Sequence, residues 1–213
     1  MEELKIGVVA EGISDYWVVK HIVERFLKNK GAYTVPLQPK ISPNDRQFGE
    51  GGWNKVFTYI SNKEYIIDSA QTEDCNYIVV QIDTDVCNEY GVNKNVTPEI
   101  LYENVLAKIL EKTHDSFDKT KIIPAICIHS IECWLIPFVA NDEKKSSKTD
   151  NCVNALNREI RTVGTIDNNN KGEAVRQGLY GYILDKKKKT REIEVVAHYN
   201  YGFSKFIESL STV

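Results

Sequence analysis

The stretch KIGVVAEGISDYWVV, residues 5–19, decides the fold class of this 213-residue chain. Residues 5–10 are almost continuously apolar, as in a strand that is covered on both faces of a sheet. Pairs of apolar residues then recur every four positions, which predicts a helix over residues 15–28 with Ser14 or Asp15 as its cap. A buried strand followed at once by an amphipathic helix is typical of α/β proteins.

The same alternation continues along the chain. Further strands are predicted at residues 76–82 and 122–128, with a helix over residues 53–68. Another helix is predicted to begin at Thr97 and Pro98, where the threonine caps the helix and the proline fills its first turn. The pattern predicts a three-layer α/β fold in which helices flank a mainly parallel sheet.

The chain changes character after residue 140. Residues 141–151 are polar and predict an exposed connection, and the remainder is mostly of helical pattern, with one strand predicted at residues 193–197. We therefore divide the chain into an α/β domain over residues 1–140 and a helical C-terminal extension over residues 141–213 that packs on the same domain.

The composition predicts a cytoplasmic protein. Hydrophobic residues make up 42% and charged residues 27%, as is ordinary for a globular protein. No apolar stretch approaches the roughly 20 residues that span a bilayer, and the acidic N-terminus does not resemble a secretory signal. The five cysteines form no CxxC pair, and most lie in or beside apolar runs, where cysteine behaves as a small hydrophobe. We expect a reducing cytosol and no membrane partner.

The net charge of −3 is unevenly distributed. Residues 171–213 contain eight Lys or Arg and five Asp or Glu, so residues 1–170 carry a charge of −6. The run DKKKKTR, residues 185–191, is interpreted as a solvated loop. Beside an acidic site, its lysines would also guide a phosphate backbone.

Three acidic residues follow the ends of apolar strands. Glu11 follows the first strand, and Asp83 and Asp85 close the strand at residues 76–82. Sites in such sheets lie at the carboxyl ends of the strands, and residues two apart in an extended chain point the same way. If the two strands are neighbours, the three carboxylates converge and repel one another unless a cation or protons neutralise them.

Oxygen ligands of this kind suit Mg²⁺ or Mn²⁺, and a metal site with open coordination positions suits phosphodiester chemistry. Each acidic position alone also has a structural interpretation, as a turn former or a helix cap. The combination is more specific, because an EGxxD element and a DxD element each follow an apolar strand.

The segments VVAEGISD (residues 8–15) and VVQIDTDV (residues 79–86) together resemble the TOPRIM domain of topoisomerases, primases and OLD-type nucleases. That family has a glutamate after its first strand and a DxD after a later one. The compact chain resembles the small TOPRIM proteins of bacterial anti-phage and abortive-infection systems. IHSIECWLIPF (residues 128–138) resembles their segment after the fourth strand, with Trp134 expected in the core. YNYGFSKFIESL (residues 199–210) resembles their C-terminal helix.

The resemblance implies a TOPRIM-like domain and a Mg²⁺- or Mn²⁺-dependent nuclease that acts on DNA or RNA. By the resemblance, Glu11 is the catalytic or metal-binding glutamate, and Asp83 and Asp85 are the metal-binding pair. Asp15 binds a second metal ion or supports the first. Glu132 is the acidic residue of the later segment, with the first turn of a helix as its alternative interpretation. The resemblance also implies an ABC-type or SMC-like ATPase as a partner in anti-phage defence.

Phosphoryl transfer also requires positive charge near the scissile phosphate. The candidates are Lys171, Arg176, and Lys40 or Arg46, and we assign the catalytic cation to Lys171 because it lies in a polar loop. Of the four histidines, His129 alone follows a predicted strand at the proposed site, and it is a further candidate.

Two other classes of function fit the sequence. The chain could be a non-catalytic binding module of an ATPase-associated complex, which the acidic balance of residues 1–170 favours, since nucleic-acid binders usually show a basic surface. It could also be a phosphate-transfer enzyme that acts on small molecules. The sequence leaves open the choice between DNA and RNA and the oligomeric state.

Overall fold

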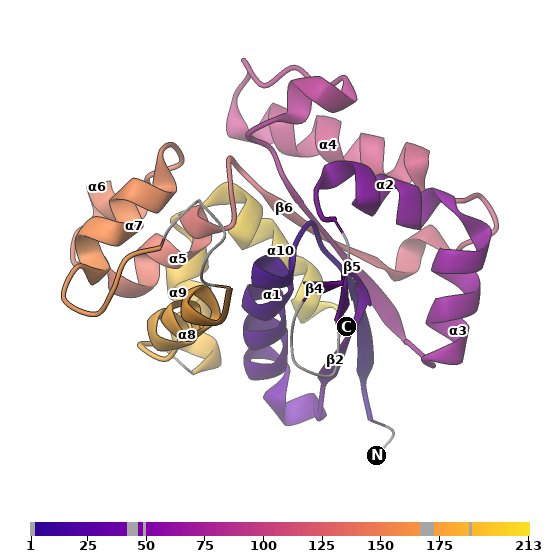
Figure 1. Ribbon diagram of the computed structural model, residues 1–213, viewed down its shortest axis with the longest axis horizontal. Helices are drawn as coiled ribbons and strands as arrows, with labels where there is room; N and C mark the ends of the chain where they lie inside the picture. The colour runs from indigo at the N-terminus through magenta and orange to yellow at the C-terminus, as the bar shows by residue number, and fades with distance from the viewer. Residues whose placement is uncertain (1–2, 42–46, 49, 167–172, 188) are drawn as a thin grey trace.

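A four-stranded parallel sheet forms the centre of the protein (Figure 1). The structure is a computed structural model that describes residues 3–41, 47–48, 50–166, 173–187 and 189–213. The strand order is β2-β1-β5-β6, and every neighbouring pair is parallel. These strands are β1 (Lys5–Val9), β2 (Tyr33–Gln38), β5 (Tyr77–Asp83) and β6 (Ile122–Cys127).

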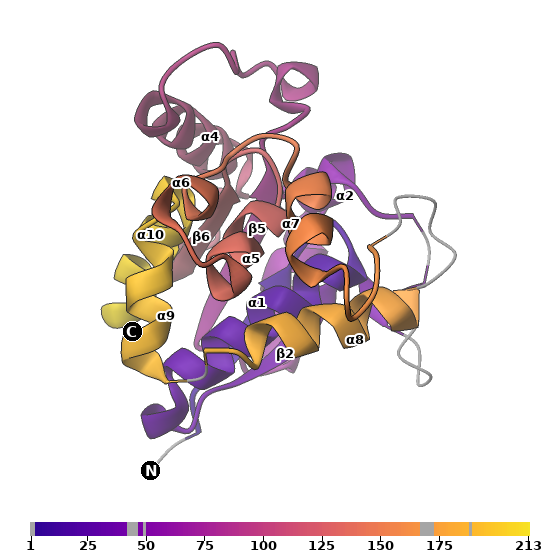
Figure 2. The same ribbon diagram turned by 90° about the vertical axis from the view of Figure 1, so that its left-hand side faces the viewer.

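Helices cover both faces of the sheet. One face is covered by α2 and α4, and the other by α1 and α10 together with the remaining longer helices (Figures 1 and 2). The helices of eight or more residues are α1 (Ile13–Phe26), α2 (Trp53–Ser61), α4 (Pro98–Lys112), α5 (Glu132–Val139), α7 (Cys152–Ile160), α8 (Glu173–Leu184), α9 (Thr190–Ala197) and α10 (Tyr201–Ser211).

Short elements connect these pieces. A two-stranded antiparallel ladder follows β2, and several single helical turns lie in the connections. The elements are β3 (Lys40–Ile41), β4 (Gln47–Phe48), α3 (Ala70–Thr72), α6 (Glu143–Ser146), the π-helical turn η2 (Glu64–Ser69), and the 3₁₀ turns η1 (Lys28–Lys30), η3 (Cys87–Tyr90) and η4 (Lys119–Lys121).

The sheet is buried on both faces, which is why its strands are continuously apolar. In β5, Val79 belongs to the core on the side of α1, whereas Val80 and Ile82 belong to the core on the side of α2 and α4. Successive side chains of a strand point to opposite faces, so a strand between two helical layers needs apolar residues at every position. The predicted α/β class, with helices flanking a parallel sheet, is confirmed. The TOPRIM-like details stay a prediction.

Two local predictions about helix starts have opposite outcomes. Thr97 caps α4, because its side chain accepts a hydrogen bond from the N–H of Ile100. The predicted cap of α1 is wrong, since the helix begins at Ile13 and Gly12 occupies the cap position with no side-chain hydrogen bond. Asp15 therefore lies in the first turn of α1.

The strand predicted at residues 193–197 is also wrong, because this segment lies in α9. Ile193, Val196 and Ala197 are buried, while Glu194 and Val195 between them are exposed. Burial at positions i, i+3 and i+4 is helical. The β-branched composition suggested a strand, and the packing of one face against α1 and α10 selected the helix.

The C-terminal helices pack against elements within residues 1–140. Helix α10 contacts β6, and α8 and α9 contact α1 (Figure 2). Their apolar residues share one core with those of β1 and α1. The division of the chain at residue 140 stays a prediction. Among the described residues, no helix combines the length and the apolar character that crossing a membrane requires.

The expectation of reduced cysteines is wrong for two of the five. Cys133 in α5 and Cys152 at the start of α7 form a disulfide, while Cys75, Cys87 and Cys127 are free. The two partners are 19 residues apart and have no recognisable spacing. Their pairing depends on the contact between α5 and α7, which the sequence does not reveal.

We expect Gly202→Ala to destabilise the protein, because α10 lies directly on β6. A Cβ atom at Gly202 would meet the Ile126 carbonyl oxygen at 2.0 Å, and backbone on both sides limits relaxation. Overpacking of this kind lowers the free energy of unfolding by about 1–3 kcal/mol or more. Urea unfolding measures the change.

The matched control for this prediction is Gly178→Ala in α8, where no atom lies within 4 Å of the added Cβ. Replacing this exposed helical glycine is expected to raise the free energy of unfolding by about 0.5–1 kcal/mol. Equal effects of the two substitutions would contradict the close packing of α10 on β6.

Candidate active site

The carboxyl ends of β1 and β5 meet at one edge of the sheet. The two strands are direct neighbours, with Val9 opposite Val80. Two residues past the end of β1, the carboxylate of Glu11 accepts a hydrogen bond of 2.7 Å from the N–H of Asp83. The condition set in the sequence analysis, that the two strands are neighbours, is therefore met, and Glu11 and Asp83 lie together.

Gln81 joins the same two residues through its side chain. Its Oε1 accepts from the N–H of Glu11 at 3.0 Å, and its Nε2 donates to Oδ1 of Asp83 at 2.8 Å. Gln81 is fully buried. The sequence analysis missed this residue, although its position two before Asp83 on one strand places it on the same face.

The N-terminus of α2 points at Glu11. The N–H of Gly52 donates to the Glu11 carbonyl at 2.8 Å, and the N–H of Trp53 bonds the Glu11 carboxylate and lowers its pKa. Gly52 has a φ of 103°, a conformation that strongly favours glycine. Helix N-termini favour negative charge, so the glycine-rich segment before α2 serves to hold a carboxylate.

Five acidic residues surround the end of β5. Burial raises the pKa of Asp83 well above its usual 3.8, and four neighbouring carboxylates raise it further. These neighbours are, in order of decreasing effect, Asp15, Glu11, Glu132 and Asp85. All five acidic residues predicted from the sequence therefore interact in the folded chain, and we call them the acidic cluster: Glu11, Asp15, Asp83, Asp85 and Glu132.

Burial and backbone hydrogen bonds have opposite effects on the pKa of Glu11. Burial raises its pKa from the usual 4.5 to about 7, although the N–H groups of Asp83 and Trp53 bond the carboxylate and lower the pKa. The charge of Asp85 adds to the rise. Without a cation, Glu11 is thus partly protonated near neutral pH.

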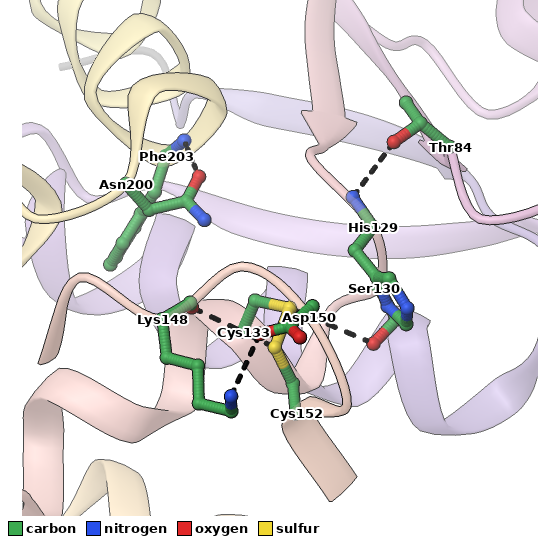
Figure 3. Close-up of a disulfide and its surroundings, with 9 residues drawn as sticks. All are labelled: Thr84, His129, Ser130, Cys133, Lys148, Asp150, Cys152, Asn200 and Phe203. Atoms are coloured by element: carbon green, nitrogen blue, oxygen red, sulfur yellow. Dashed lines mark hydrogen bonds and ion pairs between the residues drawn. A yellow bond between two sulfur atoms is a disulfide. The ribbon is translucent and has the colours of Figure 1, made fainter. Parts of the chain in front are cut away.

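Asp85 reaches the cluster by a turn and not by strand alternation. Strand β5 ends at Asp83, and the N–H groups of Thr84 and Asp85 both donate to the His129 carbonyl, at 2.9 and 3.0 Å. The N–H of His129 donates in return to Oγ1 of Thr84 at 2.7 Å (Figure 3). We expected Asp83 and Asp85 to point the same way because they share an extended strand. That reason is wrong, because Asp85 lies in the turn after the strand.

Glu132 fits both of its sequence interpretations. It lies in the first turn of α5, and its charge raises the pKa of Asp83. Although it is only 8% exposed, its Oε1 accepts a hydrogen bond of 2.6 Å from the hydroxyl of Tyr180 in α8. Tyr180 was not predicted, and no sequence signal links residues 48 positions apart.

Of the predicted basic residues, the structure describes the side chain of Lys40 alone. Lys171 and Arg46 lie outside the described residues, and the side chain of Arg176 in α8 is likewise outside them. Lys40 is exposed in β3. The assignment of a catalytic cation to Lys171 or Arg176 stays a prediction. His129 follows β6, as expected, and lies beside the disulfide (Figure 3).

The donor atoms of the acidic cluster are compatible with a hydrated divalent cation. They are all oxygen, the ligand type that Mg²⁺ and Mn²⁺ prefer. Within the described residues, no three of these carboxylates bring their oxygens within 4.8 Å of one another. Mg²⁺ usually keeps several waters and binds directly to one or two carboxylates, so the wider spacing fits an ion bound partly through water.

Comparison of the chain with protein-family models, curated proteins and solved structures gives no match. The relation to TOPRIM proteins therefore stays a prediction from the motifs.

We expect Glu11→Gln to weaken the pH dependence of stability in the absence of divalent cations. Because folding raises the pKa of Glu11 from 4.5 to about 7, the folded chain keeps a proton that the unfolded chain releases. The resulting stability is complete below pH 4.5 and is lost as the pH rises through about 7, a loss on the order of 3 kcal/mol. Urea unfolding across this pH range measures it.

The control is Glu64→Gln, which replaces an exposed glutamate in η2 away from the cluster. Glutamine at position 11 keeps an oxygen that accepts the Asp83 N–H. An unchanged pH profile in Glu11→Gln would show that the carboxyl group of Glu11 does not titrate in this range.

Proposed function

We propose that the acidic cluster binds Mg²⁺ or Mn²⁺ and that the protein is a metal-dependent nuclease of TOPRIM type. The observation that carries the proposal is the position of Asp83, which is partly buried among four other carboxylates at the carboxyl end of a parallel strand. Like charges gathered out of water destabilise a fold unless a cation or protons compensate them. A divalent cation would resolve this repulsion.

The residues around the cluster would prepare it for an ion. Hydrogen bonds from Asp83 and Trp53 orient the Glu11 carboxylate, and Gln81 orients Asp83. Tyr180 holds Glu132. A bound cation would polarise the scissile phosphate and lower the pKa of a water.

The remaining parts of the proposal come from the resemblance. Lys171, with Arg176 as a second candidate, would balance the charge that develops on the phosphate. An ABC-type or SMC-like ATPase would deliver the nucleic acid, and the setting would be anti-phage defence in the bacterial cytoplasm. DNA and RNA are both candidate substrates.

A non-catalytic binding module is the second candidate. The charges around Asp83 favour this candidate, because the four charged neighbours that raise the pKa of Asp83 are carboxylates. Such a surface repels a phosphate backbone when no cation is bound. Both candidates predict that cations stabilise the fold, whereas only the nuclease predicts turnover.

We expect Asp83→Asn to reduce metal-dependent cleavage of DNA or RNA by about 100-fold or more. The substitution keeps the shape of the side chain but removes the charge at the centre of the cluster, and even loss of a residue that only supports a metal ligand costs 10–100-fold. Plasmid, linear and single-stranded DNA and RNA are incubated with Mg²⁺ or Mn²⁺, with and without chelator. Asp115→Asn is the control, since the Asp115 side chain is 98% exposed.

Cleavage by Asp83→Asn at the rate of the parent protein would refute the site. Cleavage of nucleotides or other small phosphate esters, but not of polynucleotides, would indicate a small-molecule enzyme. Absence of cleavage in the parent, with or without an added ABC-type or SMC-like ATPase, would favour the binding module.

We further expect Mg²⁺ or Mn²⁺ to raise the melting temperature of the parent protein and to have little effect on Asp83→Asn. An ion that binds only the folded chain stabilises it in proportion to the logarithm of its concentration above Kd. The rise should be larger above pH 7, where protons no longer compete for Glu11. Thermal unfolding at several metal concentrations measures it, and an equal rise in both proteins would place the ion elsewhere.

A further inference from the structure

A second group of metal-binding residue types lies beside the acidic cluster. His129 follows β6, Cys133 is in the first turn of α5, and Cys152 begins α7 (Figure 3). One potential ligand atom from each of the three lies within 4.8 Å of the other two. In the described part of the chain, no other group of three such residues is as compact.

The imidazole of His129 has an unusual environment. Its Nδ1 atom is buried and has no hydrogen-bond partner among the described residues. A buried polar atom without a partner costs free energy, and its presence in a folded protein calls for an explanation. Neither core packing nor the hydrogen bonds of the acidic cluster explain why Nδ1 of His129 has no partner.

The backbone holds His129 in place. Its N–H donates to Thr84, its carbonyl accepts from two N–H groups of the turn after β5, and its φ of 70° is in the left-handed region. This conformation is uncommon for residues other than glycine and is adopted more readily by Asn, Asp and His. Metal ligands must be held in place by the residues around them, and the backbone contacts of His129 do this for the imidazole beside the two cysteines.

We propose that, once the Cys133–Cys152 disulfide is reduced, the two sulfurs and the His129 imidazole bind one Zn²⁺ ion. An external dithiol supplies two electrons and two protons, which break the S–S bond and form two thiols while the dithiol becomes a disulfide. Binding of the ion then releases both thiol protons, leaving two thiolate ligands and one neutral imidazole ligand. Three protein ligands leave a fourth position for water.

The ligand types select the metal. Thiolate and imidazole are the usual zinc ligands, with Zn–S distances of about 2.3 Å and Zn–N distances of about 2.0–2.1 Å. At a tetrahedral ion such ligands lie roughly 3.5–3.8 Å from one another, which is inside the 4.8 Å span of the present group. The two bonded sulfurs must separate, and the imidazole nitrogen must come within this range of both sulfurs. The acidic cluster, which is all oxygen, prefers harder ions, so the two sites differ in metal preference.

The proposed zinc site touches the acidic cluster through the backbone. Cys133 directly follows Glu132, and the His129 carbonyl binds the N–H groups of Thr84 and Asp85. A bound ion would therefore tie the turn after β6 to α5 and α7 in the reduced protein, as the disulfide ties α5 to α7 in the oxidised one. The inference does not depend on the proposed nuclease function.

The test is a titration of the 213-residue protein with Co²⁺, which replaces Zn²⁺ and reports thiolate ligation by a charge-transfer band. The reduced protein, kept in a phosphine reductant, is expected to bind one ion with thiolate charge-transfer and tetrahedral ligand-field bands. Added Zn²⁺ should abolish both bands by displacement. The oxidised protein should show neither band, because its two sulfurs are bonded to each other.

Two variants and one control locate the site. Cys152→Ser should remove most of the charge-transfer band and weaken Zn²⁺ binding by about 100-fold or more, since even supporting residues contribute 10–100-fold. His129→Asn should weaken binding similarly while keeping the left-handed backbone, which Asn tolerates. Cys127→Ser is the matched control, because Cys127 is a buried free thiol in β6 outside the group.

A reduced parent protein without the thiolate charge-transfer band would overturn the proposal. Co²⁺ bound without this band would indicate binding at the carboxylates. Unchanged Zn²⁺ affinity in either Cys152→Ser or His129→Asn would also overturn it, and the comparison of reduced with oxidised parent protein needs no variant to fold.

Discussion

The hydrogen bond from the Asp83 N–H to the Glu11 carboxylate joins the ends of the two central strands, and the rest of the candidate site depends on it. The bond forms because β1 and β5 are adjacent and parallel, so their carboxyl ends reach the same edge of the sheet. Gln81 adds two further hydrogen bonds between the same residues. Together these contacts place two carboxyl groups side by side at low exposure to water. The unusual electrostatics of the site follow from this placement.

The fold limits the cost of this concentration of charge. The N-terminus of α2 directs N–H groups at Glu11, and the positive end of a helix favours a carboxylate. The hydroxyl of Tyr180 bonds Glu132, the most buried of the four carboxylates around Asp83. Burial nevertheless remains the largest effect on the pKa values of both Glu11 and Asp83. The site is thus held together by backbone geometry in spite of its charge.

Helix α5 links the acidic cluster to the C-terminal part of the chain. Trp134 is fully buried, as expected, and stacks on Phe203 and Phe206 of α10 with ring centroids 4.8 and 5.3 Å apart. Because α10 in turn lies on β6, this aromatic contact fixes α5 relative to the sheet. Glu132 and Cys133 precede the tryptophan directly. Helix α10 therefore has a part in positioning both the acidic cluster and the group around His129.

The sequence by itself determined three strands of the central sheet, β1, β5 and β6, and it identified every member of the acidic cluster. Continuous apolar runs at β1, β5 and β6 can be read directly, because a strand covered on both faces must be apolar throughout. The carboxylates that follow them stand out for the same reason. Gln81 was also within reach, since it shares a strand with Asp83.

Only the tertiary structure decided the rest. The turn that brings Asp85 to the cluster depends on the His129 carbonyl, 44 residues away in sequence. The Tyr180–Glu132 hydrogen bond and the Cys133–Cys152 disulfide likewise join separate helices. In α9, β-branched residues form a helix because packing on α1 and α10 outweighs a small local preference. Hydrophobic periodicity encodes each element and its buried face, whereas contacts between elements depend on how those faces fit together in three dimensions.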